Sequence, residues 1–145
     1  MTQHHRGRCH CGNIRVLFES EKTAQALAVR ACGCSFCRGH GARTTTDAEG
    51  SAEIEVADAS RLSRYRFGLK TADFLICGNC GAYMGALFED DDGSTYVTLN
   101  TRYFEDPEAY AANPGPVDYE AERAEDRRAR RRKVWTPAAA MREGG

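Results

Sequence analysis

Apolar and polar residues alternate along several short segments between residues 13 and 99. In the segment 13–19, Ile14, Val16 and Phe18 fall on one side of an extended chain, and the residues on the other side are polar except Leu17. A period of two is typical of a β-strand with one buried face. Short apolar segments predict strands at 13–19, 25–31, 52–56, 62–67, 73–76, 83–88 and 95–99, with a short one near Thr44. Such short, regularly spaced strands predict a mainly β fold of antiparallel pairs.

The segments between these strands carry turn and loop signals. The Asp-Asp-Asp-Gly run at 90–93 predicts a hairpin turn, because Asp tolerates a left-handed backbone and Gly supplies positive φ. The segment 35–47 is rich in Gly, Thr and Arg and is expected to be mostly loop. Residues 1–12 are polar and basic, so we expect His4 and His5 to lie in a terminus without fixed structure.

The C-terminal part changes from strand signals to helix signals. The Asp-Pro pair at 106–107 predicts a helix start, followed by one or two turns over 108–112 and a break at the Asn-Pro-Gly-Pro run 113–116. The segment 118–133 is almost wholly charged or Ala, with acids early and bases late, and predicts a helix. Because acids precede its bases, we interpret it as a solvated helix rather than a nucleic-acid or membrane surface. The Val-Trp pair at 134–135 then predicts an apolar anchor for the tail.

The composition indicates one domain, residues 1–145, with no targeting or membrane segment. A chain of 145 residues has the length of a single domain. Its net charge is −1, so the whole chain has no electrostatic preference for nucleic acid. No apolar run is long enough to cross a bilayer, and residues 1–12 lack the apolar core of a secretory signal. With no sign of an oxidising compartment, we expect reduced cysteines and a cytoplasmic location.

Seven cysteines occur in three tight groups. They are the pair Cys9 and Cys11, the triplet Cys32, Cys34 and Cys37, and the pair Cys77 and Cys80. Tetrahedral zinc takes four ligands, and short spacings let one turn of backbone present two thiolates to one ion. The two pairs complete one closed site, and the triplet is left with three ligands and an open position. Closed sites are typical of structural zinc and open ones of catalytic zinc, so the chain predicts two zinc ions with different roles.

Other interpretations of the cysteines remain open at this point. An odd count cannot pair fully in disulfides within the chain, and the spacings do not match the ferredoxin runs that hold iron–sulfur clusters. Two purely structural zincs are a further alternative, in which His10, His40 or an acid fills the open position. The His-x-Glu and Pro-Cys-x-x-Cys signature of zinc deaminases is absent.

The cysteine motifs resemble those of one family in order, spacing and flanking residues. They are Gly7-x-Cys9-x-Cys11-Gly12, Cys32-x-Cys34-Ser35-x-Cys37-Arg38, Cys77-x-x-Cys80-Gly81 and, after a basic stretch, Trp135. The chain thereby resembles the glutathione-dependent formaldehyde-activating enzymes, which include centromere protein V-like proteins. It departs from them at Ile76, where an aromatic usually stands (here Phe74 is two residues earlier), and in lacking a His within 119–133. These differences lie in the expected pocket wall and concern the substrate.

The resemblance implies a fold, two metal sites and a reaction. The fold is a β-tent of small antiparallel sheets. A structural zinc is implied at Cys9, Cys11, Cys77 and Cys80, and a catalytic zinc at Cys32, Cys34 and Cys37. The implied activity is that of a carbon–sulfur lyase, which makes or cleaves the S-hydroxymethyl adduct of glutathione and formaldehyde.

The chemistry of an open three-thiolate site is consistent with this reaction. Three thiolates make zinc a poorer Lewis acid for water than three neutral His would, but the site still binds an incoming thiol and lowers its pKa. Arg38, directly after the triplet, is a candidate for balancing the anionic site or binding a substrate carboxylate. Ser35 and His40 are further candidates. The alternative function is a non-catalytic, zinc-stabilised binding module that contacts a partner through the basic helix, and this helix with Trp135 is also a candidate homodimer contact.

Overall fold

The computed structural model describes residues 1–110, 115–117 and 122–144, and within them eleven strands form one continuous hydrogen-bonded sheet. The strands are β1 (Gln3–Arg8), β2 (Ile14–Ser20), β3 (Val29–Cys32), β4 (Thr44–Thr45), β5 (Ser51–Val56), β6 (Leu62–Tyr65), β7 (Asp73–Cys77), β8 (Tyr83–Glu89), β9 (Thr95–Asn100), β10 (Gly115–Val117) and β11 (Thr136–Glu143). Two α-helices, α1 (Ser35–His40) and α2 (Ala124–Val134), and three short 3-10 turns accompany them, the latter at Ala59–Arg61, Thr101–Tyr103 and Pro107–Tyr110. The mainly β class is confirmed.

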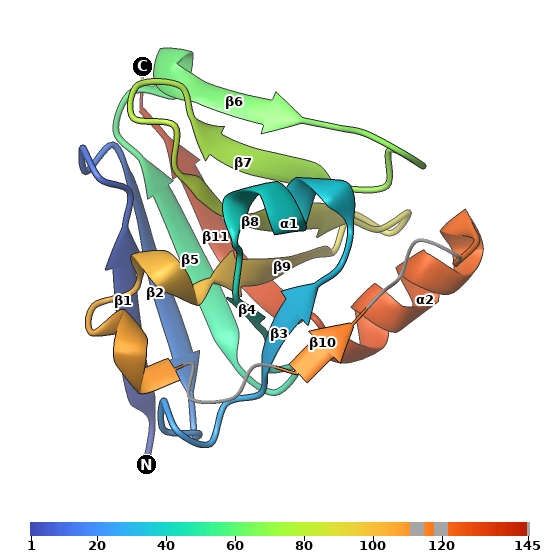
Figure 1. The fold of residues 1–145 in the computed structure, drawn as a ribbon, viewed down its shortest axis with the longest axis horizontal. Helices are drawn as coiled ribbons and strands as arrows, with labels where there is room; N and C mark the ends of the chain where they lie inside the picture. The colour runs from blue at the N-terminus through green and yellow to red at the C-terminus, as the bar shows by residue number, and fades with distance from the viewer. Residues whose placement is uncertain (111–114, 118–121, 145) are drawn as a thin grey trace.

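Strand β11 joins the two halves of the sheet. Its first residues, Thr136 and Pro137, pair with β9, and the rest of the strand pairs with β5 beyond an irregularity between Ala138 and Ala140. One half therefore runs β1-β2-β5-β11, and the other contains β9 with β8, β7 and β6 on one side and β4, β3 and β10 on the other. In Figure 1 the first half rises steeply while β6 to β9 lie across it.

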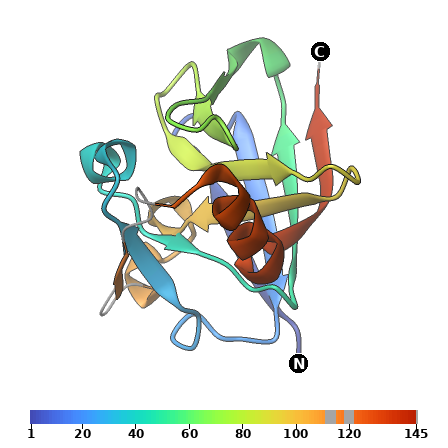
Figure 2. The same cartoon turned by 90° about the vertical axis from the view of Figure 1, so that its right-hand side faces the viewer.

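The two halves enclose the main core between them. Alternate residues of β2, Ile14, Val16 and Phe18, are buried there as their pattern predicts, together with the buried face of β5. Strand β8 is buried on both sides: Met84 faces the main core, whereas Phe88 and Tyr83 belong to two smaller clusters on the opposite face. That opposite face is covered by α1 and α2, and Figure 2 shows α2 lying across β8 and β9. The fold thus leaves a space between two helices above one face of the sheet.

Most strand predictions between residues 13 and 99 are confirmed, but the second is too long. Residues 25–28, predicted as strand, precede β3. They follow a turn in which the Thr23 carbonyl oxygen accepts hydrogen bonds from the backbone N–H groups of Ala26 and Leu27. The hairpin turn at 90–93 is confirmed between β8 and β9, with Gly93 at φ 86°. The expected antiparallel pairing holds except in two pairs: β10, at an edge of the sheet, runs parallel to β3, and β11 runs parallel to β5.

The expectation that the N-terminus lacks fixed structure is wrong. Residues 3–8 form β1, which pairs with β2 along its whole length. The inward positions of this strand are His5 and Gly7, so the period of two is present but is not carried by apolar residues. His5 is buried, and its ring nitrogens lie 2.7 Å from the Tyr110 hydroxyl and 3.0 Å from the Lys22 carbonyl oxygen. These contacts tie the strand to two other segments.

The C-terminal predictions are confirmed in outline and corrected in detail. The helical turn expected over 108–112 is a 3-10 turn at Pro107–Tyr110, and residues 111–114 lie outside the described part of the chain. The charged helix expected at 118–133 is observed as α2 over 124–134; residues 122–123 precede it and are not helical, and 118–121 lie outside the described part of the chain. Trp135 is buried against Ala72, Ala86 and Phe88, as an anchor should be. A strand, β11, follows the helix where only a tail was expected. Within the described residues, no helix is both long and apolar enough to cross a bilayer.

Candidate metal centres and cavity

The first cysteine cluster joins two turns that are far apart in sequence. Cys9 and Cys11 follow β1, Cys77 ends β7, and Cys80 lies in the turn between β7 and β8. All four sulfur atoms lie within 4.8 Å of one another, with 3.7 Å between the Sγ atoms of Cys9 and Cys11 and 3.6 Å between those of Cys11 and Cys77. A tetrahedron with zinc–sulfur bonds of about 2.3 Å places its sulfurs about 3.8 Å apart. The cluster therefore has the size and donor set of a four-thiolate metal site.

Backbone groups around this cluster favour thiolates. The N–H of Ile14 points at Cys9 Sγ over 3.2 Å, and the N–H of Cys80 points at Cys77 Sγ over 3.5 Å. Each turn closes on a left-handed glycine, Gly12 or Gly81. Burial raises the pKa of Cys9 to about 11, whereas hydrogen bonds from Asn79 and from the Asn13 backbone lower that of Cys11 to about 6. A divalent cation at the centre would allow all four thiols to ionise together, since it removes their mutual repulsion.

The second cluster is assembled by a helix that the sequence did not predict. Residues 35–40, expected to be loop, form α1, and Cys34 is its N-cap, with Sγ accepting the N–H of Cys37 at 3.4 Å. Gly41, at φ 61°, ends the helix in the left-handed conformation. The cap and the first turn bring Cys34 and Cys37 to the same side, facing Cys32 at the end of β3. The helix is short enough that its sequence lacks a helical period, so only the cap could have indicated it.

The three sulfur atoms of the triplet also lie within 4.8 Å of one another. Hydrogen bonding within the triplet lowers the pKa of Cys34 and raises that of Cys37, which is also buried. Neighbouring thiols share their protons unequally in this way when no cation is present. A bound metal ion would take the place of the shared protons. Within the described residues no His, Asp or Glu joins either cluster, so His10 and His40 are not part of the ligand sets that the geometry brings together. The exposed His40 ring instead packs at a tilt against the Phe36 ring, with the ring centroids 4.5 Å apart.

The triplet opens into a cavity of about 430 Å³ between α1 and α2. Ser35, Thr44 and Phe74 line this cavity, whereas Ile76, expected in the pocket wall, is not among its described lining residues. Phe74 and Tyr83 form an aromatic wall with Phe67, the ring centroids of Phe67 and Phe74 being 4.7 Å apart. Burial, followed by the charge of the three cysteines, raises the pKa of Tyr83 well above its ordinary value. The cavity thus has sulfur donors on one side and a largely apolar wall beside them.

The opposite wall is basic and comes from α2. Arg127, Arg130 and Arg131 line the cavity, so the expectation of a wholly solvated helix is wrong for this face. Arg130 Nε and Nη2 each donate to a different oxygen of the Glu122 carboxylate over 3.0 Å, and Arg127 lies 3.6 Å from the same group. Arg38, proposed from its place beside the triplet, is exposed and is not among the residues that line the cavity. The arginines of α2 were missed because nothing in a charged run marks which face docks.

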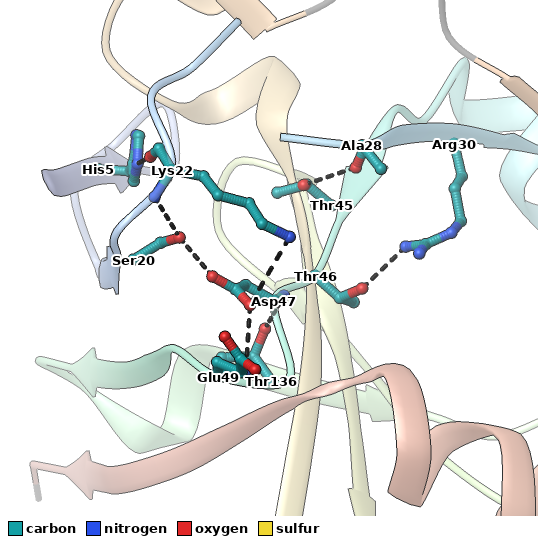
Figure 3. A network of polar contacts seen from close by, with 10 residues as sticks. All are labelled: His5, Ser20, Lys22, Ala28, Arg30, Thr45, Thr46, Asp47, Glu49 and Thr136. Atoms are coloured by element: carbon teal, nitrogen blue, oxygen red, sulfur yellow. Dashed lines mark hydrogen bonds and ion pairs between the residues drawn. The ribbon is translucent and has the colours of Figure 1, made fainter. Parts of the chain in front are cut away.

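A fourth arginine, Arg30 on β3, enters the cavity from beside the triplet. Its Nη1 donates to the Thr46 hydroxyl over 2.8 Å, and Figure 3 shows this contact next to a separate polar network around Asp47. In that network Asp47 accepts from the Ser20 hydroxyl, and its backbone N–H donates to the Thr136 hydroxyl over 2.8 Å. The network joins three parts of the chain: the end of β2, the segment that follows β4, and the start of β11. It thereby holds together the strands next to this side of the cavity.

Comparison with known proteins agrees with the cysteine pattern. A family model described as "Glutathione-dependent formaldehyde-activating enzyme" matches residues 4–117. The fold is similar to the crystal structure of a Rhodobacter sphaeroides protein, with a TM-score of 0.56 and 27% sequence identity over 77% of this chain and 97% of the other. No significant match occurs among curated proteins.

Proposed function

The chain belongs to the glutathione-dependent formaldehyde-activating enzyme family, and from this premise we propose that it adds a glutathione-type thiol to a small aldehyde and catalyses the reverse cleavage. In the forward direction a bond forms between the thiol sulfur and the carbonyl carbon, and the thiol proton ends on the carbonyl oxygen. In reverse the carbon–sulfur bond breaks, which makes the protein a carbon–sulfur lyase. No further reactant is needed in either direction.

One observation carries this proposal: three cysteine sulfurs converge at the wall of a cavity rather than on an open surface or inside the core. A zinc ion held by Cys32, Cys34 and Cys37 would supply an open coordination position at which a thiol ionises near neutral pH. The cavity volume of about 430 Å³ suits a small peptide thiol, because ligand cavities span about 300 to 1,000 Å³. Its aromatic wall makes the surroundings of the sulfur atoms less polar, which would strengthen electrostatic interactions with a bound reactant.

The two cysteine clusters take different roles in this proposal. Cys9, Cys11, Cys77 and Cys80 hold a structural zinc that fixes the turns after β1 and β7. The triplet holds the second ion, and its three donors leave room for the substrate. The chain would therefore bind two zinc ions.

The experiment compares the wild-type chain with Cys34→Ser. The interconversion of ¹³C-formaldehyde and its glutathione adduct is followed by NMR exchange, and zinc per chain is measured by atomic emission. We expect the wild type to bind two zincs and to accelerate exchange above the uncatalysed rate. The variant should stay folded, retain one zinc and lose the acceleration. Exchange that is equally fast with Cys34→Ser, or no faster with wild type than in buffer, would rule the proposal out.

The alternative function, a binding module, has one supporting observation. Arg128, Arg132 and Lys133 of α2 are exposed and present a basic surface away from the cavity. Two zincs that resist a chelator equally, together with no binding of any thiol, would favour this module. One zinc lost early, with thiol binding lost alongside it, would favour the enzyme.

A further inference from the structure

Arg131 is a buried cation at the cavity wall, and among the described residues it forms no ion pair. The residue is 5% exposed, and it lines the cavity. Its Nη1 donates to the Thr71 hydroxyl over 2.6 Å, and its buried Nε has no hydrogen-bond partner. Among the described residues no carboxylate lies within ion-pair distance of Arg131; Glu122 pairs with Arg127 and Arg130 instead. The guanidinium therefore has unused donors in a place that water reaches poorly.

Packing holds this guanidinium in a fixed orientation. Its central carbon lies 4.7 Å from the centre of the Trp135 ring and 5.9 Å from that of the Phe88 ring. Burial, and then the charges of Arg130 and Arg127, lower its pKa to about 9, so it keeps its proton at neutral pH. Contact with ring faces offsets part of the cost of burying a cation, but it provides no counter-charge. A fixed cation at a cavity wall, with no ion-pair partner among the described residues, is suited to an anionic group of a ligand.

We propose that Arg131 is the receptor for a carboxylate of the ligand and makes the cavity selective for carboxylate-bearing reactants. This inference rests on the proposed function, because it requires that reactants enter this cavity. A planar guanidinium can bind a carboxylate through two parallel hydrogen bonds, a geometry that a lysine does not reproduce. The carboxylate has two sources: the thiol, since glutathione carries two carboxylates, or the electrophile, if the aldehyde is itself a 2-oxo acid.

The test compares ligands with and without the carboxylate on four proteins: the wild type, two variants of Arg131 and one control variant. Isothermal titration of the zinc-loaded full chain gives the Kd of glutathione and of its diethyl ester, and of glyoxylate and formaldehyde in the presence of 2-mercaptoethanol. The variants are Arg131→Met, which removes the charge, and Arg131→Lys, which keeps the charge but loses the planar fork. Arg128→Met is the matched control, because Arg128 is an exposed arginine of the same helix and does not line the cavity. Circular dichroism verifies that each variant is folded.

We expect wild type and Arg128→Met to prefer the acid over its neutral counterpart by about 30-fold or more, in one ligand pair or both. Arg131→Met should reduce this preference to about 3-fold or less, with Arg131→Lys between them. Loss confined to the glutathione pair identifies the thiol as the source, and loss confined to glyoxylate identifies the electrophile.

Two results would overturn the inference while leaving the proposed function standing. One is equal binding of acid and neutral ligand by the wild type. The other is an equal weakening of both ligands in Arg131→Met, which would mean that Arg131 acts only in packing against Trp135. Failure of the wild type to bind any thiol would overturn the proposed function and this inference together.

Discussion

The closed cysteine cluster makes a quantitative prediction about stability, best tested with Cys80→Ser. Cys80 is only half-buried, so replacing its sulfur by oxygen removes little packing. Without a metal, such a substitution should change the free energy of unfolding by about 0.5 kcal/mol or less. A structural zinc site contributes about 10–16 kcal/mol to folding, as much as the whole net stability of a typical domain, about 5–15 kcal/mol.

The predicted effect of Cys80→Ser is therefore large even if the remaining three thiolates retain the ion weakly. A loss of only a third of the site's contribution, about 3–5 kcal/mol, would lower Tm by roughly 6 to 20 °C in a chain of this length. Thermal melts by circular dichroism give Tm, and atomic emission gives the number of zinc ions per chain. Cys34→Ser is the matched control, because it removes one half-buried thiol from the other cluster and should lose its zinc with little change in Tm. A Cys80→Ser protein with wild-type Tm, or the reverse pattern between the two variants, would refute the assignment of the sites.

Two further predictions concern the sheet and the N-terminal half. Gly85→Ala should lower the free energy of unfolding by more than about 2 kcal/mol, because its Cβ would lie 2.3 Å from the Thr98 carbonyl oxygen. The control Gly39→Ala has open space around its Cβ and should raise the free energy of unfolding by up to about 1 kcal/mol. Urea unfolding measures both values, and equal effects of the two substitutions would contradict the tight strand contact. Burial raises the pKa of Tyr110 to about 12 from about 10 in an unfolded chain, so between these pH values the unfolded state holds fewer protons and stability falls as pH rises. Tyr110→Phe should flatten that fall while losing about 1 kcal/mol at pH 7, because its hydrogen bond to His5 is gone, and an unchanged alkaline slope would count against this account.

Local patterns predicted most of the strands correctly, because alternation records which face of a strand is buried. The pattern failed where the inward residues were not apolar. In β1 the inward positions are His5 and Gly7, and β11 begins with Thr-Pro and an alanine run that carries no strand period. Helix α1 was not predicted for a different reason. It is only one and a half turns long, and it is stabilised by the Cys34 cap and the left-handed Gly41 rather than by an apolar stripe.

The sequence by itself determined the grouping of sulfur donors. Spacings of two or three residues bring thiols together within one turn of backbone, whatever the rest of the chain does, and counting to four then separates a complete ligand set from an incomplete one. Only the tertiary structure decided what faces the incomplete set. Arg131 lies almost a hundred residues from Cys34, and no local rule sets the distance between them. That neighbourhood depends on Trp135 docking against β8 and on β11 joining both halves of the sheet, which are contacts between segments remote in sequence.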